Sequence, residues 1–136
     1  MVSQLPFKWS VRIYFEDTDS GGVVYHSNYL KFMERARTEW LRSLALNQVD
    51  LRKKDKIMFV VANVNIDYKK AARFNDELDI ETSLDKIGAS RVDLTQYIMK
   101  NLDLYTSAKV SIACIHSETF KPQRIPKLIK QQMEIL

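Results

Sequence analysis

Hydrophobic and polar residues change their spacing along the chain, and each spacing predicts an element. β-Branched and aromatic residues fill Val11 to Phe15, which we interpret as a first strand. From Asn28 to about Leu44, apolar residues recur every three or four positions and charged residues fill the others, a pattern typical of a helix with one buried side. Arg37 is the exception, a cation on the predicted apolar side.

After a charged connection over residues 50–56, the apolar spacing shortens to every second residue, which predicts strands with one exposed face. The alternating residues are Ala62, Val64, Ile66 and Tyr68, then Leu78, Ile80, Thr82 and Leu84, then Val92, Leu94, Gln96 and Ile98, and last Ala108, Val110, Ile112 and Cys114. A short strand over 120–125 and a helix over 127–135 follow. The order predicts an α+β fold, with one long helix on one face of a curved antiparallel sheet.

Length and hydropathy limit the class of protein. A chain of 136 residues is predicted to form one domain over 1–136. The longest apolar run, Ile57 to Ala62, falls far short of the roughly 20 residues of a membrane helix, and the N-terminus lacks the features of a signal peptide. We therefore expect a soluble, cytoplasmic protein without membrane insertion.

Charge and cysteine content narrow the expected partners. The net charge of +4 comes from 21 basic and 17 acidic residues that are mostly interspersed, which favours an anionic ligand only mildly. The basic tail from Lys121 to Lys130 suits a solvated surface or phosphate groups, and no nucleic-acid recognition motif accompanies it. Cys114 is the only cysteine, so no intrachain disulfide can form, and its place on an alternating apolar face predicts a buried thiol.

Residues 16–26 are the candidate functional segment, because acids, paired glycines and a histidine meet there between the first predicted strand and the helix. Carboxylates can act as nucleophiles or bases, and glycines let a backbone approach a ligand closely. A helix N-terminus adds unpaired N–H groups that favour negative charge. The same residue types also suit a turn followed by a helix cap, so a purely structural role is an alternative.

Two familiar binding motifs do not fit this segment. With Asp17 at position one of an EF-hand, position five is Gly21 and position twelve is Asn28, where calcium needs oxygen ligands and a bidentate Glu. The glycines also lack the Lys-Ser/Thr pair of a phosphate-binding P-loop. The sequence therefore predicts neither a metal nor a cofactor.

The order of residues over 12–29, RIYFEDTDSGGVVYHSNY, and over 32–39, FMERARTE, closely resembles the 4-hydroxybenzoyl-CoA thioesterase family. Within that family the match is best to the YbgC-type acyl-CoA thioesterases associated with the bacterial Tol-Pal system. The resemblance extends over nearly the whole chain, including Lys121-Pro122. It implies a hot-dog fold, in which an antiparallel sheet wraps a long central helix. It also implies a homodimer whose sheets join, often paired again into a homotetramer, with active sites at the subunit interface.

The resemblance also implies roles for individual residues. The catalytic carboxylate of the family corresponds to Asp19, either as a nucleophile on the thioester carbonyl or as a base that activates water. The backbone N–H at the helix start, which corresponds to His26, would donate to the oxyanion. The implied substrate is an acyl-CoA, or an acyl group on acyl carrier protein, and no cofactor is implied.

Neighbouring residues would complete the site. Gly21 and Gly22 would let the loop approach the pantetheine arm, and Tyr25 and Tyr29 could line an acyl pocket or belong to the core. Exposed Lys or Arg side chains are expected near the phosphates of coenzyme A, and the sequence does not identify them.

Three alternatives remain open at this stage. Glu34 and Glu39 are rival acids on the helix, although their cluster with Arg35 and Arg37 favours ion pairing. A hot-dog hydratase of the MaoC type would place its Asp and His closer together than Asp19 and His26 are. A non-catalytic module that binds acyl-CoA or acyl carrier protein is the third alternative.

Overall fold

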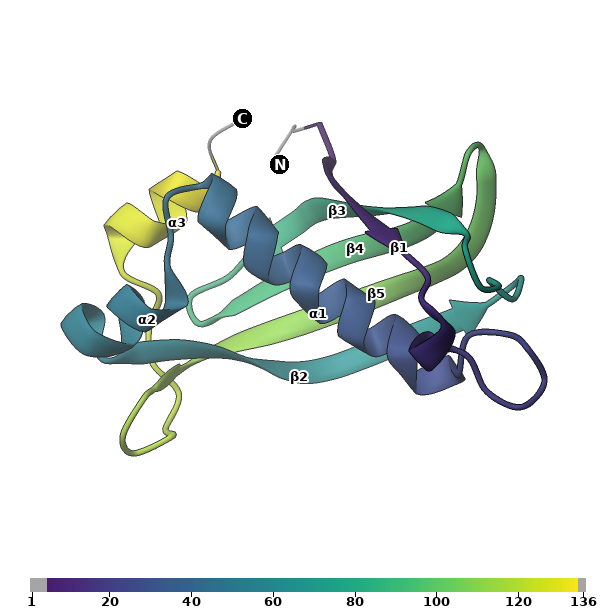
Figure 1. Ribbon diagram of the computed structural model, residues 1–136. Coiled ribbons are helices and arrows are strands. Elements are labelled where there is room, and N and C mark those ends of the chain that lie inside the picture. The colour runs from purple at the N-terminus through teal and green to yellow at the C-terminus, as the bar shows by residue number, and fades with distance from the viewer. Residues whose placement is uncertain (1–4, 135–136) are drawn as a thin grey trace.

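The computed structural model describes residues 5–134, and Figure 1 shows its elements. In chain order they are β1 (Phe7–Arg12), a 3-10 turn η1 (Phe15–Asp17), α1 (His26–Ser43), α2 (Gln48–Asp50), a π-helical turn η2 (Leu51–Asp55), β2 (Ile57–Tyr68), β3 (Glu77–Ile87), β4 (Arg91–Lys100), β5 (Asp103–His116) and α3 (Lys127–Met133).

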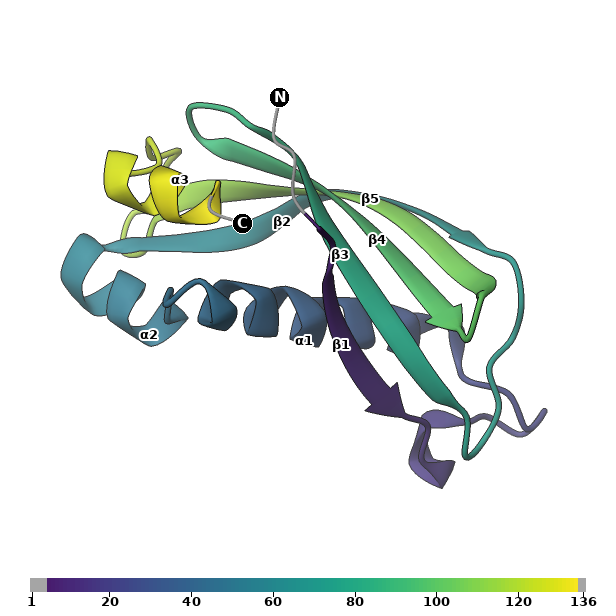
Figure 2. The same ribbon diagram turned by 90° about the horizontal axis from the view of Figure 1, so that it is seen from above.

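The five strands form one antiparallel sheet in the order β1-β3-β4-β5-β2. The sheet curves over one side of α1, as Figures 1 and 2 show from two directions. The face of α1 that meets the sheet consists of Tyr29, Phe32, Met33, Ala36, Trp40 and Leu41, all buried. Burying a side chain such as Phe32 or Met33 contributes about 1.5–3 kcal/mol. The α+β architecture predicted from the sequence is confirmed.

The long helix and the alternating strands were predicted well, with shifted ends. Helix α1 begins at His26, two residues before the predicted start, and Leu44 is its C-cap. Each of the four alternating segments lies within one of β2 to β5. The predicted burial of Cys114 is also confirmed, because its side chain is fully buried.

The predicted first strand over 11–15 was wrong in position. Strand β1 ends at Arg12, and Phe15 begins the 3-10 turn η1. The side chain of Asp17 accepts a hydrogen bond from the Tyr14 N–H (2.8 Å), which draws the chain out of the sheet and into the turn. The true strand starts earlier, where Phe7, Trp9 and Val11 alternate toward the core.

Two further segments differ from the prediction. The charged connection over 50–56 is mostly helical, because the Asn47 side chain caps α2 by accepting from the Val49 N–H (2.8 Å). Residues 120–125 form only an isolated bridge between Ile115 and Pro122, since proline has no N–H for a strand ladder. Helix α3 ends at Met133, and residue 135 lies outside the described residues.

Strand β2 lies at an edge of the sheet. It pairs with β5 on one side, and no strand of the described chain pairs with its other side. The strand is 12 residues long, with a register irregularity between Val61 and Asn63, and the Val61 side chain is 47% exposed. A long edge strand with exposed apolar side chains is a surface suited to pairing with another chain. No helix within residues 5–134 is long and apolar enough to cross a membrane.

Candidate active site

The loop between β1 and α1 closes on itself through backbone hydrogen bonds. The Asp19 N–H donates to the Val23 carbonyl (2.9 Å), and the Gly22 N–H donates to the Asp19 carbonyl (3.0 Å). Gly22 has a φ of +79°, in the left-handed region that side chains other than glycine rarely adopt. A glycine at position 22 therefore lets the chain reverse direction shortly after Asp19.

The Asp19 carboxylate is exposed and held at one end only. Its Oδ1 accepts a hydrogen bond from the Gly21 N–H (2.8 Å), and a Cβ at Gly21 would lie 3.2 Å from that oxygen. Its other oxygen, Oδ2, has no hydrogen-bond or ion-pair partner among residues 5–134. One oxygen thus fixes the orientation of the group, and the other is free for chemistry at a substrate.

Asp17, unlike Asp19, forms hydrogen bonds that connect the loop to the helix. Its Oδ2 accepts from the Tyr14 N–H, and its carbonyl accepts from the Tyr25 N–H (3.1 Å) and from Asn28 Nδ2 (2.8 Å). These bonds join η1 to the first turn of α1. Glu16 is exposed and contacts no charged partner within the described chain. The Asp17 carboxylate is likewise held through one oxygen, but it is half-buried and its residue joins η1 to α1, whereas the Asp19 carboxylate is exposed.

His26 is the first residue of α1, and its N–H has no acceptor among the described residues. The positive end of the helix dipole lies at this N–H. The His26 carbonyl accepts from Tyr68 Oη (3.2 Å), and the His26 ring centroid lies 4.5 Å from that of Tyr25 and 6.4 Å from that of Tyr68. The helix start is thus fixed by its neighbours while its first donor stays open.

The two tyrosines suggested for the acyl pocket differ in exposure. Tyr25 is 47% exposed beside His26. Tyr29 is only 3% exposed, its Oη accepts from the Ala72 N–H (3.0 Å), and burial raises the pKa of its hydroxyl. A substrate contact stays a prediction for both. Sequence reasoning missed a site role for Tyr68, which is 44% exposed, and the available signal was its place at the end of the alternating apolar row.

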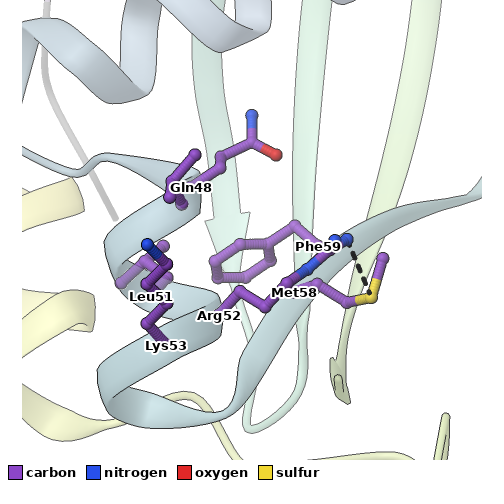
Figure 3. A pocket seen from close by; sticks show the side chains of 7 residues that line it. Gln48, Leu51, Arg52, Lys53, Met58 and Phe59 are labelled. Atoms are coloured by element: carbon purple, nitrogen blue, oxygen red, sulfur yellow. Dashed lines mark hydrogen bonds between the residues drawn. The ribbon is translucent and has the colours of Figure 1, made fainter. Parts of the chain in front are cut away.

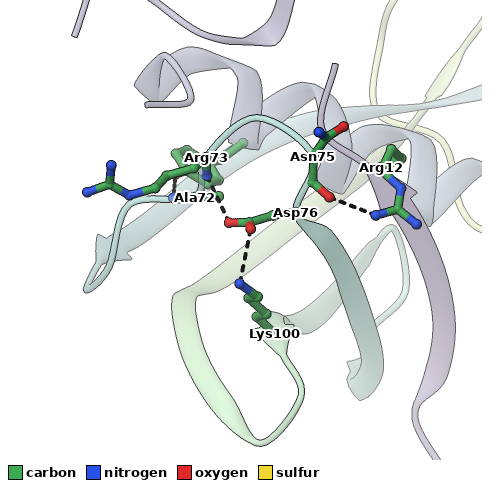
Figure 4. Close-up of polar contacts among 7 residues, drawn as sticks. Arg12, Ala72, Arg73, Asn75, Asp76 and Lys100 are labelled. Atoms are coloured by element: carbon green, nitrogen blue, oxygen red, sulfur yellow. Dashed lines mark hydrogen bonds and ion pairs between the residues drawn. The ribbon is translucent and has the colours of Figure 1, made fainter. Parts of the chain in front are cut away.

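The segment between β2 and β3 lies against the Asp19 loop. The Val24 N–H donates to the Ala72 carbonyl (2.9 Å), and Val23 pairs with Arg73 in an isolated bridge. Figure 4 shows how Asp76 ties this segment down: its Oδ2 accepts from the Arg73 N–H (2.9 Å) and its Oδ1 from Lys100 Nζ (3.0 Å). Burial raises the pKa of the Asp76 carboxyl, but these two bonds outweigh it, so the pKa lies below the ordinary value.

A groove follows α1 along strand β2. It contains two neighbouring cavities of about 270 Å³ and 210 Å³, which share Glu34, Arg37 and Val61, and the second reaches Leu30, one turn beyond His26. Arg37 Nη1 donates to Gln96 Oε1 (3.0 Å), and burial lowers the pKa of the guanidinium. The cation that interrupted the apolar pattern therefore faces this groove.

From the sequence, Glu34 and Glu39 were expected to form ion pairs in one cluster with Arg35 and Arg37, and the structure differs for both acids. Glu39 pairs with Arg42, outside the predicted cluster. Glu34 has no ion pair within the described residues and lines both cavities. Ion pairing is thus found for one of the two rival acids, and its partner is a different arginine.

A third cavity of about 380 Å³, shown in Figure 3, lies at the far end of α1 and shares Gln48 and Phe59 with the 270 Å³ cavity. Leu51, Met58 and Phe59 give it apolar walls, and Arg52 and Lys53 add cations. Helix α1 has 18 residues and so spans roughly 27 Å, which separates this cavity from the Asp19 loop of the same chain.

Comparisons with known proteins agree with this fold. The model of the thioesterase-like superfamily matches residues 13–133. An acyl-CoA thioesterase YbgC from Haemophilus influenzae is 42% identical over 124 residues, which cover 91% of this chain and 91% of the relative. An acyl-CoA thioester hydrolase YbgC from Escherichia coli is 40% identical, with 90% and 92% covered. The crystal structure of a probable thioesterase from Bartonella henselae superposes with a TM-score of 0.85 at 36% identity, covering 89% of this chain and 99% of that one.

Proposed function

The chain belongs to the thioesterase-like superfamily, and we propose that it hydrolyses the thioester bond of an acyl-CoA with Asp19 as its catalytic carboxylate. One observation carries the proposal: the exposed Asp19 carboxylate is held through Oδ1 by the Gly21 N–H and keeps Oδ2 free, in a loop that leads into the open N-terminus of α1. A thioester carbonyl between Oδ2 and the His26 N–H would meet a nucleophile or base on one side and an oxyanion donor on the other.

The backbone donor has a defined energetic role in this proposal. As the carbonyl carbon becomes tetrahedral, negative charge develops on its oxygen, and the His26 N–H at the positive end of α1 would stabilise that charge. A single donor of this kind is commonly worth about a hundredfold to a thousandfold in kcat. The hydrogen bond from Tyr68 Oη to the His26 carbonyl would keep the first turn in position.

Asp19 has two chemically complete routes. As a nucleophile, its carboxylate attacks the carbonyl carbon, the C–S bond breaks, and the CoA thiolate leaves and takes a proton; water then hydrolyses the mixed anhydride to the free acid and the original carboxylate. As a base, it takes a proton from water, the resulting hydroxide attacks, and the proton passes to the leaving thiolate. Label in the Asp19 side chain after a single turnover in ¹⁸O-water signals the anhydride. Label confined to the released acid fits the base route and also an anhydride opened at the acyl carbon, and trapping of an acyl-Asp19 intermediate distinguishes these two.

The groove between α1 and β2 is the proposed place of the acyl group. It begins one turn beyond His26 at Leu30, and Val61 and Val64 give it apolar walls. Comparing chain lengths tests this, because a longer acyl group should bind more tightly until the groove is filled. Acyl carrier protein is the other carrier to compare. A cytoplasmic location and an association with the Tol-Pal system stay predictions from the resemblance.

We also propose a homodimer formed through strand β2, with a homotetramer as the alternative that mass measurement distinguishes. The exposed edge and the apolar Val61 support pairing of two β2 strands. In an antiparallel pair, the start of one β2 lies beside the end of the other. The cavity at Phe59 of one copy would then approach Tyr68 and the Asp19 loop of its partner, giving a site shared by two chains. Val61→Lys should yield monomers by mass measurement; because Val61 also lines the acyl groove, the measured mass and not the activity tests the dimer.

The decisive experiment follows thiol release from acyl-CoA substrates of several chain lengths, with hydration of crotonyl-CoA measured in parallel. Thioester cleavage that depends on Asp19 supports the proposal. Hydration without cleavage would identify a hydratase. Tight acyl-CoA binding without either reaction would identify a binding module.

A further inference from the structure

Residues 69–74 between β2 and β3, which we call the strap, are fixed beside the Asp19 loop. The strap joins the loop through the bond from the Val24 N–H to the Ala72 carbonyl and through the bridge between Val23 and Arg73. Ala72 is fully buried, and its N–H donates to Tyr29 Oη. The strap therefore offers a firmly held backbone from which exposed side chains can act.

Arg73 is an exposed cation on this fixed backbone. Its N–H is bound to Asp76, while its guanidinium has no hydrogen-bond or ion-pair partner among residues 5–134. Figure 4 shows the guanidinium extending away from Asp76, whose other oxygen accepts from Lys100. Both Asp76 oxygens are thus bound by other groups, so Asp76 acts on the Arg73 guanidinium only through longer-range attraction, which leaves the N–H donors of the guanidinium available for a ligand.

Of the two lysines of the strap, one has charged or aromatic partners and the other forms no ion pair within the described residues. Lys70 Nζ lies 3.7 Å from Asp103 and 5.9 Å from the Tyr105 ring centroid, so its charge has partners. Lys69 is exposed, and its ammonium has no ion pair within the described residues. The strap thus carries two cations, Lys69 and Arg73, that form no ion pair within the described residues, beside a loop rich in acids.

We propose that Arg73, assisted by Lys69, binds the diphosphate of the nucleotide part of coenzyme A, an inference that rests on the proposed thioesterase function. Asp19 lies opposite Val23, and Val23 lies opposite Arg73, so two strand spacings of about 4.8 Å separate the loop acid from the strap. The extended Arg73 side chain places its guanidinium still farther from Asp19. A long separation is needed here, because the pantetheine arm lies between the thioester and the phosphates of coenzyme A. A guanidinium binds phosphate oxygens in a bidentate manner, which suits this position.

The test compares two substrates with the same acyl group, acyl-CoA and acyl-pantetheine, since only the first carries phosphates. Arg73→Gln should raise KM for acyl-CoA on the order of tenfold with kcat unchanged, and should leave both constants for acyl-pantetheine unchanged. Arg73→Lys should recover part of the loss, because it restores the charge without the bidentate geometry. Lys86→Gln, which removes the same charge at the opposite end of β3, is the matched control and should change neither substrate.

Binding of coenzyme A itself, measured by calorimetry on the folded variants, gives a readout independent of turnover. Weaker binding of CoA by Arg73→Gln, with an effect that shrinks as salt rises, supports the proposal. Equal effects on both substrates, or no effect on either, would overturn it while the proposed function stands. Failure of the wild type to cleave either substrate would instead overturn the proposed function. Circular dichroism of each variant separates these outcomes from misfolding.

Discussion

Gln96 is predicted to be a main polar support beneath α1. Its side chain is fully buried, its Nε2 donates to the Met33 carbonyl (3.1 Å) and to Thr82 Oγ1 (2.9 Å), and its Oε1 accepts from Arg37 (3.0 Å). Gln96→Leu removes all three bonds. At about 1 kcal/mol each, with the bond to the charged Arg37 somewhat stronger, the loss is about 3–4 kcal/mol. The added apolar contact of leucine offsets about 1 kcal/mol.

The net expectation is a fall of about 2–3 kcal/mol in the free energy of unfolding, or roughly 8 °C in Tm for a chain of this size. Urea denaturation at fixed protein concentration measures it, with the fluorescence of Trp9 and Trp40, packed against and within the core, as the signal. Gln131→Leu, at an exposed position, is the control and should change stability by less than about 0.5 kcal/mol. A loss in Gln96→Leu no larger than in this control would show that the three hydrogen bonds do not stabilise the fold. A double-mutant cycle with Arg37→Met should give a coupling of about 1 kcal/mol.

Three further perturbations follow from the geometry. Gly21→Ala should lower kcat several-fold with a stability change below about 1 kcal/mol, because its Cβ would press on Asp19 Oδ1 at 3.2 Å; unchanged kinetics would contradict this. Burial raises the pKa of Cys114 to about 11, so a thiol reagent at pH 8 should label it only when the protein unfolds. The lowered pKa of Asp76 means that its ion pair stabilises the fold above the ordinary aspartate pKa and loses this effect as pH falls through the folded pKa. The stability gap between wild type and Asp76→Asn should therefore narrow from pH 7 to pH 3, and a constant gap would exclude the mechanism.

The sequence predicted those parts of the fold that follow from regular spacing. The apolar periods of α1 and of β2 to β5 were sufficient, because these elements bury one side against each other. The 3-10 turn at Phe15 was missed because a side-chain bond from Asp17 decides it, and local propensity favours a strand there. Helix α2 was missed for a similar reason, since the Asn47 cap acts within a segment that reads as a charged connection.

The sequence predicted the site residues of the loop, but it did not predict the residues from other elements that surround the loop. Asp19 and His26 lie in one contiguous segment, so the order of residues identified them. Tyr68 and Arg73 reach the same region only through strand pairing and a loop bridge, which connect positions more than forty residues apart in the chain. Arg37 was visible as an exception in the helix, but its partner Gln96 depended on the packing of α1 against β4.

The most direct test of the account is the rate of acyl-CoA hydrolysis by Asp19→Asn beside that by Glu16→Gln. Both changes neutralise one exposed acid of the same loop, and of these two residues only Asp19 has a carboxylate oriented by a hydrogen bond. We predict that Asp19→Asn lowers kcat by about a hundredfold or more, as expected for a general base or nucleophile, with an unchanged circular dichroism spectrum, while Glu16→Gln stays close to wild type. Wild-type turnover in Asp19→Asn would exclude Asp19 as the catalytic carboxylate.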